Sequence, residues 1–232
     1  KALADYHNVS EATIRRDLDE LAAAGIIERT HGGAIVIDRS TSFEHKYSEK
    51  MNLMLAEKCS IAKAACELIR DGDTIFLDSG TTTYFIAQNL GSFKNLTVIT
   101  HDLQIANTAI LHSTSTLIVT GGIRREGFSV LVGSVTENFI RELKVDIVFL
   151  GADAIDVENG VYNANFLEVG IKKLLLKIGK SIILVSDTSK FSRSALAKVC
   201  RINSIDILIT DKGITDEISE QLRKKGIQLI IA

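Results

Sequence analysis

Asp78-Ser-Gly-Thr-Thr-Thr83 joins two stretches of different character. It follows Thr74–Leu77, a short apolar run that is typical of a buried strand, and precedes Tyr84–Leu90, which has helical spacing. The first turn of a helix has unpaired N–H groups and a partial positive charge, and the hydroxyls add further donors. We therefore expect this turn to bind a phosphate or a carboxylate. The alternative is that the hydroxyls only cap the helix and that Asp78 only ends the strand.

The same alternation of apolar runs and helical segments continues to the end of the chain. We expect strands at residues 74–78, 96–100, 116–120, 146–150, 181–185, 205–209 and 227–231, and helices at residues 55–70, 84–90, 103–111, 133–143, 166–178 and 215–225. Strands that alternate with helices form a parallel sheet covered by helices on both faces. The expected fold class is therefore α/β, with a Rossmann-like parallel sheet.

Polar residues and glycines follow most of the expected strands: Asp78, His101, Asp102, Gly121, Gly122, Asp153, Asp187 and Lys190. Ligands of open parallel sheets bind beyond the carboxyl ends of the strands, so this row predicts one pocket. Lys190, with Arg124 or Lys172, would supply positive charge for a phosphate. The carboxylates suit the hydroxyls of a polyol. Glu168 and Lys172, four residues apart on one helix, have the alternative of being a surface ion pair.

Composition limits the classes of protein to which this chain can belong. Its 232 residues are 46% apolar, which is enough for one large or two modest domains, and its net charge of -2 does not by itself indicate a nucleic-acid or membrane partner. There is no apolar run of transmembrane length and no signal-peptide pattern at the start. The three cysteines form no C-x-x-C pair. We expect a cytoplasmic protein without a metal site or cofactor.

The first forty residues have the pattern of a helix-turn-helix followed by a β-hairpin. Ser10 is a candidate N-cap for a helix at residues 11–23, and residues 26–37 have the pattern of two strands around a turn at 31–33. The second helix of such a motif places its N-terminal half in the DNA major groove. However, residues 1–39 carry five Lys or Arg against seven Asp or Glu, whereas most DNA-binding domains are basic. A small helical interaction domain is the alternative.

Val9-Ser-Glu-Ala-Thr-Ile-Arg-Arg-Asp-Leu18, with Arg29-Thr-His-Gly-Gly-Ala34, resembles the DeoR family of bacterial repressors. The resemblance implies a winged helix-turn-helix. The DNA-binding residues that it implies are Ser10, Thr13, Arg15, Arg16, Arg29 and His31. The family's first helix is absent from this sequence, and we expect that it was truncated or left unobserved.

The remainder of the chain resembles the family's sugar-phosphate sensor domain, which is similar in fold to ribose-5-phosphate isomerase and the CoA transferases. The effector-binding residues that this implies are Asp78, Ser79, Gly80, Thr81, Thr82, His101, Asp102, Gly121, Gly122, Arg124, Asp153, Glu168, Lys172 and Lys190. His101 stands where family members commonly have asparagine, so it would favour a different sugar or titrate near neutral pH. Ala154 replaces a common glycine. Asn163–Phe166 replaces an acidic run, so carboxylate contacts from that loop are not expected.

The predicted organisation is a winged helix-turn-helix at residues 1–38, a linker at 39–54 and a sensor domain at 55–232. We expect a transcriptional repressor of a sugar-metabolism operon whose binding to operator DNA is controlled by a phosphorylated sugar. The alternative is an enzyme, a sugar-phosphate isomerase that uses the carboxylates as bases. Two operator half-sites require two DNA-binding units, so a homodimer or homotetramer is expected. Phe43 and Tyr47 would dock the linker on a neighbouring surface, unless it is a disordered hinge.

Overall fold

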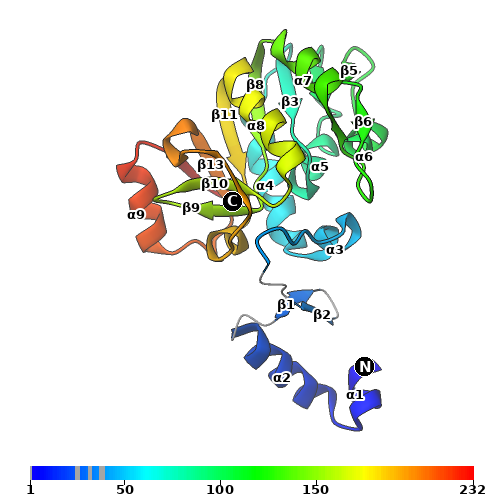
Figure 1. Ribbon diagram of the computed structural model, residues 1–232, viewed down its shortest axis with the longest axis vertical. Helices are drawn as coiled ribbons and strands as arrows, with labels where there is room; N and C mark the ends of the chain where they lie inside the picture. Colours follow the sequence, from blue (N-terminus) through cyan, green and yellow to red (C-terminus); the bar gives the residue numbers. More distant parts are fainter. Residues whose placement is uncertain (1, 24–26, 31–32, 37–39) are drawn as a thin grey trace.

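A parallel sheet forms the centre of the molecule in the computed structural model, which describes residues 2–23, 27–30, 33–36 and 40–232 (Figure 1). The seven strands are β3 (Thr74–Leu77), β4 (Thr97–Thr100), β5 (Thr116–Val119), β8 (Val145–Leu150), β11 (Gly179–Val185), β13 (Ile207–Thr210) and β14 (Gln228–Ile231). Their order in the sheet is β14-β13-β11-β8-β3-β4-β5, and all neighbouring pairs are parallel. The predicted α/β fold class is confirmed.

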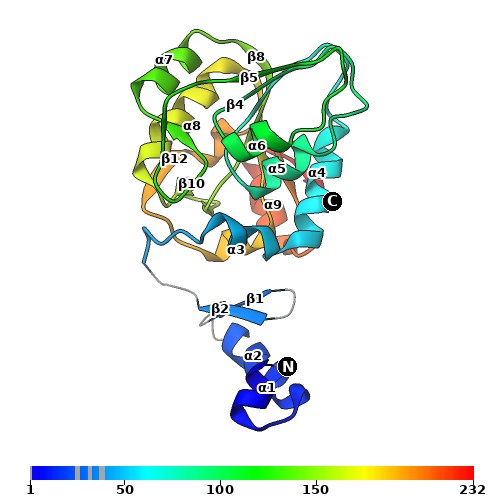
Figure 2. The ribbon, with the colours of Figure 1, turned by 90° about the vertical axis from the view of Figure 1, so that its right-hand side faces the viewer.

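Both faces of the sheet are covered by helices, because successive strand residues point to opposite faces and both sets are apolar. In β8, Ile147 and Phe149 belong to one buried apolar cluster, whereas Val148 and Leu150 belong to the other. The first cluster includes residues of α4 (Leu55–Cys66), α5 (Thr81–Ala87) and α6 (Leu103–Thr108). The second includes residues of α7 (Ser134–Arg141), α8 (Phe166–Ile178) and α9 (Asp216–Lys224) (Figure 2).

The direction of chain progress through the sheet reverses between β3 and β8. From β3 the chain passes outward through β4 to β5, then returns to β8 and proceeds the other way through β11 and β13 to β14. The connections that leave β3 and β8 at their carboxyl ends therefore turn away from each other. A crevice at such a switch point is the usual ligand site of an open parallel sheet.

Two small antiparallel sheets lie outside the central sheet and were not expected from the sequence. One pairs β6 (Ile123–Arg124) with β7 (Leu131–Val132), and the other has the order β12-β10-β9, formed by Ala197–Cys200, Gly160–Asn163 and Ala154–Asp156. Two 3-10 turns, Thr188–Ser192 and Ile202–Ser204, complete the described elements of this half. Gly160 has φ 123°, and a Cβ there would lie 2.0 Å from the Cys200 carbonyl oxygen, so the pairing of β10 with β12 requires glycine.

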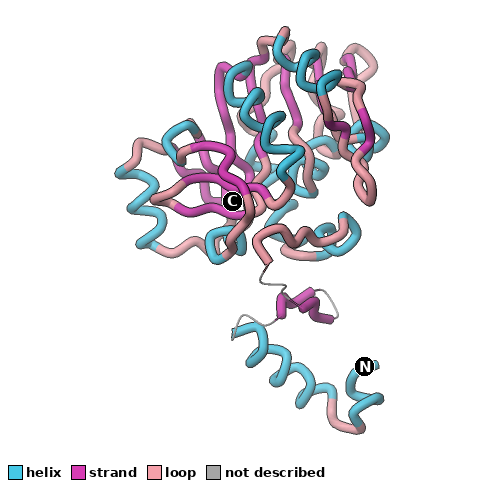
Figure 3. Tube along the Cα trace, viewed as in Figure 1, coloured by secondary structure: helices cyan, strands magenta, loops and turns pink. Residues whose placement is uncertain are grey.

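The N-terminal unit lies beyond the carboxyl-end side of the sheet domain (Figures 1 and 3). It consists of α1 (Ala2–His7), α2 (Glu11–Ala23) and an antiparallel hairpin of β1 (Ile27–Thr30) and β2 (Gly33–Val36). The linker contains α3 (Tyr47–Asn52), which packs beneath the sheet domain on the side that faces the hairpin (Figure 2). In the described ranges, no helix combines the length and apolar character needed to cross a membrane.

Candidate effector pocket and DNA-binding unit

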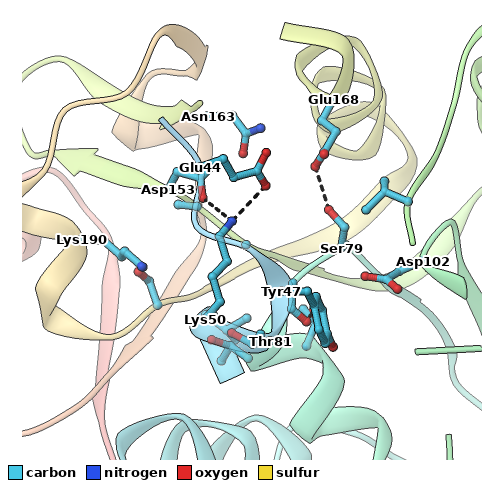
Figure 4. Close-up of a pocket in the computed structure, with 18 of the residues that line it drawn as sticks. Glu44, Tyr47, Lys50, Ser79, Thr81, Asp102, Asp153, Asn163, Glu168 and Lys190 are labelled. Carbon is cyan, nitrogen blue, oxygen red and sulfur yellow. Dashed lines mark hydrogen bonds and ion pairs between the residues drawn. The ribbon is translucent and has the colours of Figure 1, made fainter. Parts of the chain in front are cut away.

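A pocket opens at the carboxyl ends of β3, β4, β8 and β11, where the switch point predicts one (Figure 4). Ser79, Gly80, Thr81, Thr82, Asp102, Asp153, Glu168, Lys172 and Lys190 are the predicted effector-binding residues that line it. Thr83 and Asp187, which belong to the predicted turn and to the predicted row of strand-end residues, also line it. Further lining comes from residues that were not assigned to the site: Glu44, Tyr47, Lys50, Leu53, Lys58, Phe128, Val130, Gly151, Ala152, Asn163, Val185 and Ser186. The pocket therefore includes part of the linker.

Asp78 lies behind the wall of the pocket and not in it. Its side chain is fully buried, and its Oδ2 accepts hydrogen bonds from the Gly151 N–H, at 2.9 Å, and from the Lys172 ammonium. Lys172 also donates to the Gly151 carbonyl oxygen at 3.1 Å. Burial lowers the pKa of Lys172, but the carboxylates of Asp78 and Glu168 outweigh that effect and hold the pKa above its ordinary value. Asp78 thus fixes a charged Lys172 between β3 and β8, and the expected contact of Asp78 with sugar hydroxyls is wrong for this conformation.

His101 is also fully buried behind the pocket. Its Nε2 lies 3.7 Å from Asp78 Oδ1, and neither ring nitrogen has a hydrogen-bond partner among the described residues. Burial lowers the pKa of His101 to about 4, an effect that the nearby Asp78 carboxylate opposes only in part. The ring is therefore neutral at physiological pH, and the prediction that it titrates near neutrality is wrong. His101 packs against the Asp78–Lys172 pair and does not reach the pocket.

Gly121, Gly122 and Arg124 lie outside the pocket, contrary to expectation. Thr136 Oγ1 in α7 donates to the Gly121 carbonyl oxygen at 2.7 Å, and a Cβ on Gly122 would lie 2.1 Å from that same hydroxyl oxygen. The two glycines therefore let α7 approach the end of β5. Arg124 is exposed on β6, whereas the adjacent Arg125 is 8% exposed and turns toward the pocket.

Two carboxylates of the pocket are held in polar networks. The Ser79 hydroxyl donates to Glu168 Oε2 at 2.9 Å, and Glu168 Oε1 lies 3.0 Å from Arg125 Nη2. Asp102 caps α6 by accepting from the N–H groups of Gln104, at 2.8 Å, and of Ile105, at 3.3 Å. Burial raises the pKa of Glu168 to about 7 and that of Asp102 to about 6. Both side chains therefore hold protons more tightly than ordinary carboxyls.

The raised pKa of Glu168 has a testable effect on stability. Its ordinary value is 4.5, so between pH 4.5 and about 7 the folded state keeps a proton that the unfolded chain releases. The contribution of Glu168 to the free energy of unfolding is therefore full below pH 4.5 and falls as the pH rises through 7. We expect urea unfolding at pH 5 and pH 8 to show that Glu168→Gln gains stability relative to the wild type at the higher pH. An unchanged difference would mean that Arg125 keeps Glu168 ionised throughout.

The linker supplies charged groups to the pocket. The Lys50 ammonium donates to Glu44 Oε1 at 3.0 Å and to Asp153 Oδ1 at 3.1 Å (Figure 4). Arg125 Nη1 donates to Glu44 Oε2 at 2.8 Å. Burial raises the pKa of Asp153, but Lys50 and a hydrogen bond from the Ala164 N–H outweigh it and leave that pKa well below its usual range. Tyr47 docks against Tyr84 with ring centroids 6.3 Å apart, as expected of a docked linker.

A second group of cations and hydroxyls lines the same pocket. Lys58, which sequence reasoning missed, is 2% exposed and donates to the carbonyl oxygens of Lys50, at 2.5 Å, and Leu53, at 2.6 Å. Burial lowers its pKa to about 7. By contrast, the Lys190 ammonium and the hydroxyls of Thr81 and Thr82 have no hydrogen-bond or ion-pair partner within the part of the chain that the structure describes. These three groups are therefore available to a ligand.

The candidate DNA-binding residues lie on α2 and the hairpin. Ser10 caps α2, because its Oγ accepts from the Thr13 N–H at 3.0 Å. Arg15 and Arg16 are exposed, and the Arg16 side chain pairs with Glu20, with Nε 3.8 Å from Glu20 Oε1. Arg29 turns back onto α2, where its Nη1 contacts the Arg15 carbonyl oxygen at 3.4 Å and Asp19 at 3.5 Å. This conformation places the Arg29 guanidinium against α2. His31 lies outside the described residues.

Within residues 2–23, 27–30, 33–36 and 40–232, no group of His, Cys, Asp and Glu is arranged to hold a metal ion. The polar groups that line the pocket are mainly lysine ammonium groups, hydroxyls and carboxylates. Such a set binds a ligand that has both an anionic group and several hydroxyls.

Comparison with known proteins identifies both halves of the chain. Residues 54–212 match the DeoR C terminal sensor domain, and residues 1–40 match the DeoR-like helix-turn-helix domain. A protein of Escherichia coli O157:H7, provisionally named the aga operon transcriptional repressor, is 38% identical over 99% of this chain and 86% of its own length. The transcriptional repressor AccR of Agrobacterium fabrum is 34% identical over 97% of this chain and 88% of its own. The glycerol-3-phosphate regulon repressor of Escherichia coli K12 is 33% identical over 98% and 89%.

Among solved structures, ribose 5-phosphate isomerase A of Methanocaldococcus jannaschii is similar with a TM-score of 0.43 and 19% identity, over 60% of this chain and 55% of that one. The matched domains and the sequence relatives are regulators, so the isomerase alternative is wrong. The chain belongs to the DeoR family of DNA-binding transcriptional regulators.

Proposed function

We propose that this protein represses a sugar-metabolism operon in the cytoplasm and that a phosphorylated sugar in the pocket controls its hold on operator DNA. The observation that carries the proposal is the composition of the pocket wall. It combines a lysine and two threonine hydroxyls that have no partners in the described structure with the carboxylates of Asp102 and Asp153. The first set complements a phosphate and the second set complements hydroxyl groups.

The position of the winged helix-turn-helix relative to the pocket supports this function. We assign DNA binding to residues 1–38, coupling to residues 39–54 and effector binding to residues 55–232, with the addition of the linker residues that line the pocket. The coupling segment is continuous with both units, so a ligand that changes its position changes the placement of the DNA-binding unit. We further propose a homodimer or homotetramer, since two half-sites need two recognition helices.

A thermal-shift panel of phosphorylated sugars and polyols tests the proposed effector. Glycerol 3-phosphate is the first compound to include, because one relative is named for the glycerol-3-phosphate regulon. Ribose 5-phosphate, glucose 6-phosphate and the corresponding unphosphorylated compounds complete the panel. A ligand at a hundred times its dissociation constant stabilises a one-site protein by about 2.7 kcal/mol. Stabilisation by one phosphorylated compound, and not by its unphosphorylated form, is expected. A flat response to the whole panel would contradict the proposal.

Replacing Lys190 tests the phosphate contact. In Lys190→Ala we expect the effector to bind roughly 10- to 100-fold more weakly, because a hydrogen bond to a charged group contributes about 1.5–3 kcal/mol. Titration calorimetry measures the change, and operator binding without effector stays at the wild-type level. Lys198→Ala is the matched control, since Lys198 is exposed and lies outside the pocket lining. Wild-type effector affinity in Lys190→Ala would remove Lys190 from the site.

A further inference from the structure

The linker residues from Glu44 to Leu53, here named the strap, are tied to the pocket wall at three places. Glu44 accepts from Arg125 at 2.8 Å, and Lys50 donates to Asp153 at 3.1 Å. Lys58 of α4 donates to the carbonyl oxygens of Lys50 and Leu53, which lie at and just beyond the C-terminal end of α3. The side chains concerned are at most about one-fifth exposed, so these are not loose surface contacts.

Lys50 fills part of the pocket and pairs with a carboxylate that we assign to the ligand. Its side chain extends along the pocket and its ammonium ends between Glu44 and Asp153 (Figure 4). Asp153 Oδ1 accepts from Lys50, so a sugar hydroxyl that approaches this oxygen from the side of the ammonium has to displace Lys50 from it. Similarly, a phosphate that enters the pocket attracts the protonated form of Lys58, whose side chain hydrogen-bonds carbonyl oxygens of the strap among the described residues. The ligand and the strap therefore compete for the same groups.

We propose that the strap is an internal competitor of the effector: the effector binds by taking Asp153 from Lys50, and the strap leaves the pocket. The inference rests on the proposed function, because it specifies how that same pocket is regulated. Since the strap leads directly to the DNA-binding unit, its release converts pocket occupancy into a change in the placement of α2 and the hairpin. The ligand shifts the equilibrium because it binds the open arrangement better than the closed one.

Glu44→Gln is the informative variant. It weakens the contacts of Glu44 with Lys50 and Arg125 and keeps the size of the side chain, and Glu44 is not among the groups that we assign to the ligand. We expect glycerol 3-phosphate, ribose 5-phosphate or glucose 6-phosphate, whichever binds the wild type, to bind Glu44→Gln about three- to tenfold more tightly. We also expect the effect of that compound on operator affinity to shrink by a similar factor. Lys46→Met is the matched control, because Lys46 is exposed on the same segment and does not line the pocket.

Amide hydrogen exchange of the full chain separates this inference from the proposed function. Adding the compound should slow exchange at residues 79–83, which line the pocket, and speed exchange at residues 44–53. Slower exchange at both segments, or weaker binding by Glu44→Gln, would mean that the strap closes on the ligand and would overturn the inference alone. No change at residues 79–83 with any of the three compounds, in either protein, would overturn the proposed function and the inference with it.

Discussion

Replacing Lys172 with methionine is expected to lower the free energy of unfolding of the sheet domain by about 3–5 kcal/mol. Lys172 and Asp78 are 2% and 0% exposed, and the lysine ammonium is the charged partner of Asp78 Oδ2. Methionine fills a similar volume but leaves a buried carboxylate with only the Gly151 N–H on that oxygen. Urea unfolding followed by circular dichroism measures the loss. The melting temperature should fall by about 2–4 °C for each kcal/mol in a chain of this size.

Two further variants make this expectation specific to the ion pair. Lys173→Met, at the adjacent and exposed position of α8, should change stability by less than about 0.5 kcal/mol. The double variant Asp78→Asn with Lys172→Met removes both charges, and we expect it to recover part of the stability lost in the single variant. If Lys172→Met alone costs less than about 1 kcal/mol, Asp78 is not a buried, ionised partner of Lys172, and the account of the pocket wall given above is wrong.

The sheet and its helices could be predicted from the sequence because their signals are local. Apolar runs of strand length alternate with amphipathic segments, and both helix ends of α2 and α8 agree with the expected residues 11–23 and 166–178. The carboxyl-end rule then predicted a pocket at the switch point, where the structure has one, since the order of strands and helices fixes which ends of the strands meet. Other helices end earlier than expected: α4 ends at Cys66 and not at residue 70.

The parts of the pocket that were missed depend on contacts between residues far apart in the sequence. Lys50 meets Asp153 across 103 positions, and Glu44 meets Arg125 across 81, so no local period reports either contact. Arg124 and Arg125 differ by a single position, and only the three-dimensional course of β6 decides which of them turns inward. Sequence alone could not tell that Gly122 makes room for α7, because a glycine permits the approach of a helix as readily as that of a ligand.

Replacing both Arg15 and Arg16 with alanine is expected to reduce operator affinity by about a hundredfold or more. Both side chains are exposed on α2, and an arginine that contacts DNA contributes about 1–3 kcal/mol. Fluorescence anisotropy on a site selected from random-sequence DNA measures the loss, at one fixed salt concentration because phosphate contacts depend on salt. Arg141→Ala is the control, since Arg141 lies on α7 of the sheet domain and pairs with Glu137 at 3.1 Å.

The same double variant also tests whether the two halves of the protein are separable. None of the described pocket-lining residues belongs to α2, so the double variant should bind the effector with wild-type affinity. Effector affinity that falls together with operator affinity would contradict the division of labour between the two units.

Arg29→Ala is expected to act differently from either arginine of α2. Its guanidinium contacts Asp19 and the Arg15 carbonyl oxygen, so its loss should loosen the hairpin against α2. We expect the affinity for every DNA sequence to fall by a similar factor, while the preference for the selected site is unchanged.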